Sequence, residues 1–353
     1  MKSMTRPAPA ELGFRMPAEW MPHQATWISW PHNPETWPGV LAAAEASMAQ
    51  AVTALAGGET VRINVLDAAH EAHVRTCLGT VADAPAVVFH HFRTNDAWCR
   101  DHGAIFVRDD SGRLAAVDCG FNAWGGKYPP WDLDNAIPAQ MAAALGVRRF
   151  KGGLILEGGS IDVNGAGTVL TTEQCLLNEN RNPELSRAEL EERLALLFGV
   201  RQVLWLGDGI VGDDTDGHID DITRFVAEDV VVTVVEPERS DPNHAPLAEN
   251  LARLRDMRLT DGRPLRIIEL PMPAPVELDG ARLPASYGNF YIGNEVVLLP
   301  VFGQPADEHA ARILAGCFPG RRIVPIRATE LVVGLGTFHC LTQQVPTGVI
   351  NSR

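Results

Sequence analysis

The residues of this chain that are best suited to chemistry lie around Cys340, which directly follows His339. An apolar run, residues 331–333, precedes Gly334 and Gly336. We expect a strand, then a flexible glycine turn, then the cysteine, an arrangement that presents a side chain at the mouth of a cleft. Because the thiolate form of cysteine is strongly nucleophilic, Cys340 is the predicted nucleophile. The alternative is a buried structural thiol.

Three further polar residues stand at regular distances from this cysteine. Asp96 and Glu157 are 61 positions apart, as are Glu157 and His218, and His218 and Cys340 are 122 positions apart. Such a spacing indicates repeated structural units whose equivalent ends converge on a central axis. It predicts a closed ring of about five units.

A cysteine, a histidine and carboxylates together suit attack on a positively charged carbon. Asp96 and Asp220 can each accept a pair of N–H bonds from a planar guanidinium group. The bound cation lowers the pKa of a nearby thiol and so favours the thiolate of Cys340. His218 can give a proton to the departing nitrogen and later take one from water.

Other readings of the same residues remain open. His218 and Asp220 form a His-x-Asp pair that could bind a metal, although no second tight cluster of ligands supplies a third donor. The acidic stretch 213–216 lacks the pattern of a calcium-binding loop. Glu157 could simply end a strand, and Asp96 could cap a helix. A metal-dependent amidohydrolase and a non-catalytic protein that binds guanidino compounds therefore stay as alternatives.

The composition narrows the classes of partner. A formal net charge of −14 disfavours nucleic acid and anionic membranes as partners and mildly favours a cationic ligand. The six cysteines are scattered without a Cys-x-x-Cys pair, which is typical of reduced thiols in the cytoplasm. There is no apolar run long enough to cross a membrane. We expect a soluble cytoplasmic protein.

The elements that must position these residues alternate between strands and helices along the chain. Strands are expected at residues 25–29, 61–66, 87–92, 104–107, 114–118, 154–157, 169–171, 203–206, 222–226, 230–235, 265–270, 296–301 and 322–326. Helices are expected at residues 41–55, 136–144, 187–198, 245–257 and 307–317. Residues 1–13 are expected to form a loose arm. No linker divides the chain, so residues 1–353 are expected to form a single catalytic α/β domain.

Several motifs of this chain resemble those of one family. The motifs are Met16-Pro17-Ala18-Glu19-Trp20, Asn95-Asp96-Ala97-Trp98-Cys99-Arg100-Asp101, Glu157-Gly158-Gly159-Ser160, Asn180-Arg181-Asn182-Pro183, Asp214-Thr215-Asp216-Gly217-His218-Ile219-Asp220, Ala285-Ser286-Tyr287 with Asn289-Phe290-Tyr291, and His339-Cys340-Leu341-Thr342-Gln343-Gln344-Val345-Pro346. Together they resemble the agmatine deiminase and bacterial peptidylarginine deiminase family of the pentein superfamily. The resemblance covers nearly the whole chain.

The resemblance implies a fold and a reaction. The fold is the pentein five-bladed α/β propeller, with pseudo-fivefold repeats of two strands, a helix and a strand. The reaction hydrolyses the guanidinium group of agmatine to N-carbamoylputrescine and ammonia through a covalent thiouronium on cysteine, on a route from arginine to putrescine. No metal or organic cofactor is implied, and a homodimer is possible.

The resemblance also implies roles for individual residues. Cys340 matches the nucleophile, His218 the general acid and base, and Asp96 and Asp220 the carboxylates that bind the guanidinium group. Glu157 matches a further acid of the active site. Trp98, beside Asp96, is expected to contact the substrate.

The sequence departs from the family pattern at five positions near these residues. They are Leu335, Thr337 and Phe338 before the cysteine, Asp162 in place of the usual histidine, and Asp221 in place of the usual asparagine. None of them replaces a predicted catalytic group, so deimination is still expected. Because they lie close to the expected site, they bear on which guanidino compound is the substrate.

Free or peptidyl arginine is the alternative to agmatine as the small cationic substrate. A free or C-terminal arginine needs a cation for its carboxylate, and the loop 121–127 supplies only Lys127. The acidic residues Asp213, Asp214 and Asp216 suit the primary ammonium of agmatine instead. The sequence therefore favours agmatine, with Asp214 and Asp216 as substrate-binding residues.

Overall fold

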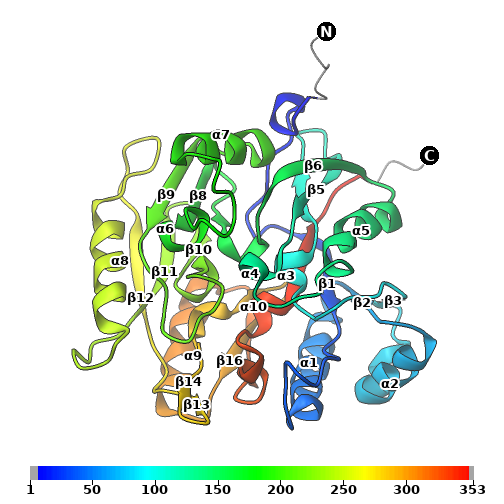
Figure 1. The fold of residues 1–353 in the computed structure, drawn as a ribbon. Helices are drawn as coiled ribbons and strands as arrows, with labels where there is room; N and C mark the ends of the chain where they lie inside the picture. Colours follow the sequence, from blue (N-terminus) through cyan, green and yellow to red (C-terminus); the bar gives the residue numbers. More distant parts are fainter. Residues whose placement is uncertain (1–6, 350–353) are drawn as a thin grey trace.

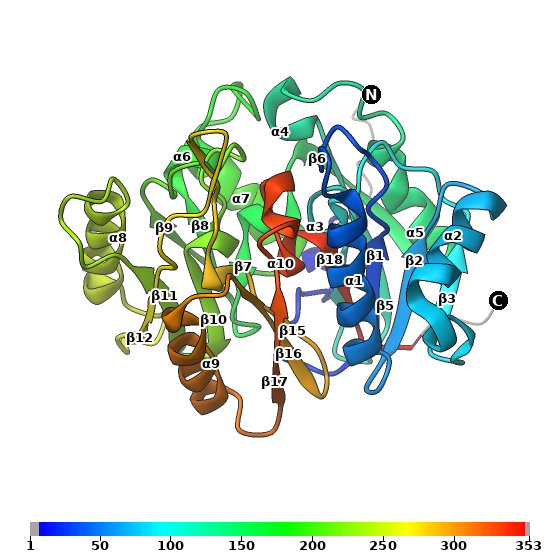
Figure 2. The same ribbon diagram turned by 90° about the horizontal axis from the view of Figure 1, so that it is seen from below.

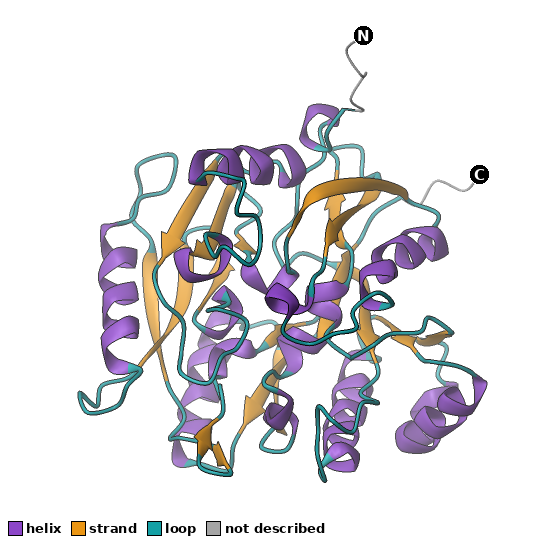
Figure 3. Ribbon diagram, in the orientation of Figure 1, coloured by secondary structure: helices purple, strands orange, loops and turns teal. Residues whose placement is uncertain are grey.

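Four three-stranded sheets share one pattern of pairing in the computed structural model, which describes residues 7–349 (Figures 1 and 3). In each sheet the middle strand is antiparallel to the strand before it and parallel to the strand after it. The sheets comprise β4 (Ile105–Arg108), β5 (Leu114–Gly120) and β6 (Arg148–Ile155); β7 (Asp162–Val163), β8 (Thr168–Thr172) and β9 (Gln202–Leu206); β10 (Thr223–Ala227), β11 (Val230–Val235) and β12 (Arg266–Pro271); and β15 (Tyr291–Ile292), β16 (Val296–Val301) and β17 (Arg322–Arg327).

Helices connect the parallel strands of these sheets, as parallel pairing requires. The connecting helices are α4 (Ala123–Gly126) and α5 (Ile137–Leu145), α6 (Glu173–Leu176) and α7 (Arg187–Phe198), α8 (His244–Asp256), and α9 (Pro305–Cys317). The predicted order of two strands, a helix and a strand therefore recurs along the chain. A separate hairpin of β13 (Glu277–Leu278) and β14 (Ala281–Arg282) follows β12.

A fifth sheet joins the two ends of the described chain. Its order is β18 (Thr342–Pro346), β1 (His23–Ser29), β2 (Thr60–Asn64) and β3 (Val87–His90), with β18 antiparallel to β1. Helices α1 (Leu41–Leu55) and α2 (Ala68–Leu78) connect its parallel strands. This pairing holds the short helix α10 (Phe338–Leu341) against α3 (Cys99–His102), and α10 lies near the middle of the molecule in two views (Figures 1 and 2).

Most of the predicted elements are present. The predicted bounds of helices α1 and α7 agree with the structure, as do those of strands β11 and β16. Helix α7 begins with a capping box between Ser186 and Glu189, in which each side chain bonds to the backbone of the other. The strands β11 and β16 are buried along nearly their whole length, as expected of apolar runs covered on both faces.

Two expectations about local structure were wrong, and one helix was missed. The run 331–333 forms a 3-10 helix, Leu331–Gly334, because Leu331 and Val332 turn into the core. The strand expected from residue 154 begins at Arg148 and ends at Ile155. Helix α2 was not predicted, because its sequence lacks an apolar stripe and buries only Val74 and Leu78.

The N-terminal arm is only partly described. Residues 1–6 of the expected arm 1–13 lie outside the described residues. Ala10–Leu12 form a 3-10 turn that contacts α7. Within residues 7–349, no helix combines the length and the apolar character that a membrane span requires.

Candidate active site

A pocket of about 900 Å³ opens beside Cys340. Its lining includes Asp96 and Trp98 from the segment between β3 and α3, Asp101 from α3, and Asp214 from the loop after β9. The structure thus brings together residues that lie up to 244 positions apart in sequence. The pocket is large enough for a small elongated ligand.

Cys340 lies on α10 and is buried at the bottom of this pocket. Asn289 Nδ2 donates a hydrogen bond to Cys340 Sγ over 2.9 Å, and Asp220 Oδ2 lies 3.6 Å from the sulfur. Burial raises the pKa of Cys340 well above its ordinary value, and the charges of Asp220, Asp221 and Asp101 raise it further. The thiol is therefore protonated until a cation offsets these carboxylates.

His218 is completely buried directly before the 3-10 turn Ile219–Asp221. Its Nδ1 lies 3.8 Å from Asp101 Oδ1 and 4.0 Å from Asp220 Oδ1. Burial lowers the pKa of His218, but the charge of Asp101, the contact with Cys175 and the charge of Asp220 together outweigh it and raise the pKa well above its ordinary value. Within the described part of the chain neither ring nitrogen has a close hydrogen-bond partner, although the Cys175 thiol lies within 4.8 Å of the ring. A protonated imidazole with free N–H groups is equipped to act as an acid.

The glycines after Glu157 allow this close packing. A Cβ atom on Gly159 would lie 2.6 Å from His218 Nδ1, and one on Gly158 would lie 2.2 Å from the carbonyl oxygen of Arg100. Both distances are too short for any side chain. The Glu-Gly-Gly sequence is therefore needed for space rather than for binding phosphate.

The two carboxylates predicted to bind a guanidinium group differ in their surroundings. Asp96 accepts hydrogen bonds from Asn33 Nδ2 (3.3 Å) and from the hydroxyl of Thr36. Burial raises the pKa of Asp96 above its ordinary value. Asp220 Oδ2 accepts from His339 Nδ1 over 2.6 Å, while Asp220 Oδ1 is buried without a partner among residues 7–349. That free oxygen can accept an N–H group of a bound cation.

Glu157 lies close to His218 but is not among the residues that line the pocket. Its Oε1 accepts from Arg181 Nε over 2.7 Å, and both side chains are completely buried. Glu157, Cys175 and His218 offer donor atoms within 4.8 Å of one another, as do Asp220, Asp221 and Cys340. Because Glu157 is already paired with Arg181, the first group is a poor metal site.

The acidic loop after β9 supplies Asp214 and Thr215 to the pocket lining and keeps Asp216 outside it. Asp214 lines the pocket and accepts from the hydroxyl of Tyr128. Burial raises the pKa of Asp214. Asp216 is paired with Lys127 Nζ (2.8 Å) and Arg181 Nη1 (2.7 Å) and is not among the lining residues.

A buried network behind the site contains residues to which the sequence assigned no role. His339 Nδ1 bonds to Asp220, and its Nε2 lies 2.8 Å from Glu19 Oε2. Arg224 pairs with Glu19 over 2.8 Å and with Asp162 over 2.6 Å. Asp162, a departure from the family pattern, thus offsets the charge of a buried arginine. The motif around Glu19 was visible in the sequence, but nothing there indicated its contact with His339.

The departures next to the cysteine have structural roles of their own. Thr337 Oγ1 donates to Asn289 Oδ1 over 2.8 Å, which orients the amide so that Nδ2 faces Cys340. Phe338 is completely buried in the core. Leu335 adopts the left-handed conformation, with φ of 72°, where a side chain is strained.

Asp221 places a second carboxylate beside the nucleophile. Asp221 Oδ1 accepts from Asn289 Nδ2 over 2.9 Å, the same amide nitrogen that bonds to Cys340. Burial raises the pKa of Asp221 well above its ordinary value, and the charges of Asp220 and Asp213 raise it further.

Replacing Asp221 with asparagine is expected to stabilise the protein at alkaline pH. The folded pKa of Asp221 lies above its unfolded value, so its contribution to stability is present at low pH and is lost as the pH rises towards the folded pKa. Asp221→Asn removes this loss and should raise the free energy of unfolding by about 1 to 3 kcal/mol near pH 8, with a smaller gain near pH 5. Urea unfolding at both pH values measures it. Asp208→Asn, at an exposed carboxylate, is the control. A gain independent of pH would contradict the assignment.

Comparisons with known proteins agree with this geometry. The family model of the Porphyromonas-type peptidyl-arginine deiminases matches residues 15–346. The agmatine deiminase of Stutzerimonas stutzeri is 38% identical over 361 residues, which cover 96% of this chain and 97% of that protein. The solved agmatine deiminase of Enterococcus faecalis superposes with a TM-score of 0.92 at 33% identity and covers 99% of this chain and 100% of its own.

A more distant likeness concerns the fold alone. The amidinotransferase SxtG from Microseira wollei has a TM-score of 0.52 at 12% identity and covers 96% of this chain and 99% of its own. The protein therefore has the α/β fold that agmatine deiminases share with amidinotransferases of the pentein superfamily. By its match over residues 15–346 and its near full-length relatives, the chain belongs to the Porphyromonas-type peptidyl-arginine deiminase family.

Proposed function

We propose that this protein is an agmatine deiminase. It hydrolyses the guanidinium group of agmatine to N-carbamoylputrescine and ammonia, in a route from arginine to putrescine. The relatives named agmatine deiminase support the reaction, and the acidic pocket beside Cys340 supports a small cationic guanidino substrate. The proposed machinery needs no metal or organic cofactor.

In the proposed mechanism, binding of the substrate activates the nucleophile. Asp96 and Asp220 accept N–H groups of the guanidinium, whose positive charge offsets the carboxylates around Cys340. The thiol releases its proton to solvent, and the thiolate forms a bond to the guanidinium carbon. Asn289 Nδ2, 2.9 Å from the sulfur, stabilises the anion by a hydrogen bond.

His218 then serves both halves of the reaction. It donates a proton to one terminal nitrogen, the C–N bond breaks, and ammonia leaves behind a covalent thiouronium. Water next adds to the same carbon and gives a proton to the neutral imidazole. The C–S bond breaks as the new hydroxyl becomes the carbonyl and gives its proton to the departing sulfur, so the urea product leaves and the Cys340 thiol is restored. Trp98 lines the pocket and is proposed to pack against the substrate.

One observation favours agmatine over arginine. Lys127, the cation of the loop 121–127, donates to Asp216 Oδ1 over 2.8 Å and to the carbonyl oxygen of Asp214. Lys127 lines the pocket, but its charge is already paired, so binding a substrate carboxylate would require it to leave these partners. The Asp214 side chain lines the pocket and is proposed to attract the primary ammonium of agmatine. Asp216 binds Lys127 and so prevents this cation from neutralising the negative charge of Asp214.

The test is ammonia release from agmatine, free arginine, peptidylarginine and methylated arginines. We expect kcat/KM for agmatine to exceed that for each other compound by about 100-fold or more, because a carboxylate would meet unpaired negative charge. A preference for arginine would contradict the substrate assignment. Tight binding of agmatine without ammonia release would instead favour a non-catalytic guanidino-binding protein.

We also propose an architecture, a cellular location and an oligomeric state for this protein. The five larger sheets form the blades of a five-bladed α/β propeller within one catalytic domain of residues 1–353, supported by their shared pairing pattern. The six free cysteines support a cytoplasmic location. The homodimer is proposed from the family resemblance, and light scattering coupled to gel filtration tests it.

A further inference from the structure

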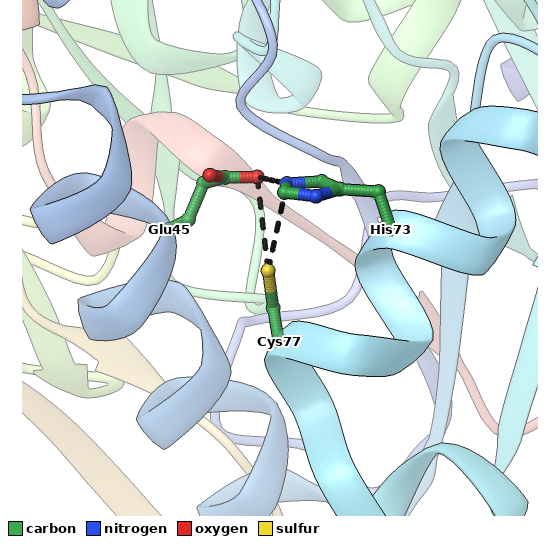
Figure 4. Close-up of side chains that lie close together, drawn as sticks. All are labelled: Glu45, His73 and Cys77. Atoms are coloured by element: carbon green, nitrogen blue, oxygen red, sulfur yellow. Dashed lines mark hydrogen bonds and ion pairs between the residues drawn. The ribbon is translucent and has the colours of Figure 1, made fainter.

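A second group of potential ligand side chains lies between helices α1 and α2, outside the residues that line the catalytic pocket (Figure 4). We propose that Glu45, His73 and Cys77 form a binding site for a transition-metal ion of the Zn²⁺ class. Glu45 comes from α1, and His73 and Cys77 come from α2, where they are one helical turn apart. Figure 4 shows the three side chains pointing toward one another.

The separations of the donor atoms approach those of a tetrahedral site. Zinc bonds of about 2.3 Å to sulfur and 2.0 Å to nitrogen or oxygen, at tetrahedral angles, place N and S about 3.5 Å apart and N and O about 3.3 Å apart. Here Cys77 Sγ lies 3.5 Å from His73 Nε2 and 4.0 Å from Glu45 Oε1. His73 Nε2 and Glu45 Oε1, 2.7 Å apart, share a hydrogen bond that an ion would replace. This pair must move apart by about 0.6 Å, and the sulfur and the carboxylate oxygen must approach each other by about 0.5 Å.

The surroundings of the three residues resemble those of a metal site rather than of a plain ion pair. The Glu45 carboxylate is 8% exposed and accepts from Trp30 Nε1 over 2.7 Å, which fixes its orientation. The His73 side chain is 54% exposed, so an ion can reach the group from solvent. The three protein donors are one nitrogen, one oxygen and one sulfur atom. They leave the fourth coordination position of a tetrahedral zinc ion to a water molecule, an arrangement that zinc adopts in proteins.

Cobalt(II) binding to the full-length protein tests the proposal, because cobalt replaces zinc and reports its ligands by absorption. We expect one equivalent per chain, with a thiolate-to-cobalt charge-transfer band and tetrahedral d–d bands. Cys77→Ser should abolish the charge-transfer band, and His73→Gln and Glu45→Gln should each weaken binding at least about 10-fold. Cys317→Ser, at another partly buried thiol, is the matched control and should bind as the wild type does.

A second variant separates this site from the catalytic cluster of Asp220, Asp221 and Cys340. Cys340→Ser should keep the full cobalt spectrum. Zinc should raise the thermal midpoint of the wild type and of Cys340→Ser but not that of His73→Gln, because only a ligand that binds the folded state stabilises it. Absence of a thiolate band in the wild type, its survival in Cys77→Ser, or its loss in Cys340→Ser would each overturn the proposal.

Discussion

Replacement of Cys340 by serine is expected to lower kcat for ammonia release from agmatine by about 10³-fold or more, with little change in the Kd for agmatine. A serine hydroxyl is a far weaker acid than a thiol, so the bound cation cannot generate the anion that attacks carbon. A loss of this size corresponds to about 4 kcal/mol of activation free energy. The carboxylates Asp96 and Asp220 are untouched, so binding of the guanidinium persists. Single-turnover kinetics and calorimetric titration measure the two quantities.

The control is Cys317→Ser, which changes a partly buried thiol on α9. It should keep the turnover of the wild type. Retained turnover in Cys340→Ser would exclude the thiolate mechanism. If that residual activity also disappeared with a chelator, the metal-dependent alternative built on His218 and Asp220 would replace it.

Replacement of His218 by glutamine is expected to lower kcat by about 10²- to 10⁴-fold, the usual contribution of a positioned acid or base. KM should change little, because the imidazole is not proposed to bind the guanidinium. The charge of Asp101 opposes the effect of burial and keeps the pKa of His218 above its ordinary value, so the acid form persists above neutral pH. In the wild type kcat should therefore fall on the alkaline side, where the imidazolium loses its proton. In His218→Gln this fall should be absent.

His91→Gln serves as the control for this variant. The His91 side chain is about half exposed and pairs with Glu71 on the surface. Its replacement should leave both the rate and its pH dependence unchanged. An unaltered alkaline fall in His218→Gln would assign that proton to another group, and a normal kcat would remove His218 from the mechanism.

Local sequence was sufficient to predict most elements, and the reasons for its failures are specific. Residues 41–55 and 187–198 combine strong helix formers with clear end signals, and both helices form as predicted. Residues 331–333 are as apolar as a strand, yet they form a 3-10 turn because the core accepts Leu331 and Val332 in that conformation. Apolar character alone does not distinguish these outcomes.

The candidate site, like the fold, was predicted from the sequence only in part. The types and spacing of Asp96, Glu157, His218 and Cys340 were apparent without coordinates, because chemistry limits which residues can act on a guanidinium group. The surroundings of these four residues could not be predicted from the sequence. Glu19 lies 320 positions from His339 in the sequence and 2.8 Å away in space. Asp216, equally acidic in the sequence as Asp214, is held outside the pocket lining by Lys127 and Arg181.

The sequence by itself therefore determined the repeating strand and helix order and the class of substrate, and it supplied the prediction that Cys340 is the nucleophile. Tertiary structure alone decided which groups are charged and where they point. The pairing of β1 with β18 brings Cys340 from one end of the chain against α3. The resulting burial, with carboxylates from separate segments, raises the pKa of Cys340. For His218 burial lowers the pKa, and the carboxylates Asp101 and Asp220 raise it against that effect. These shifts depend on distance and on exclusion of water, which local sequence does not specify.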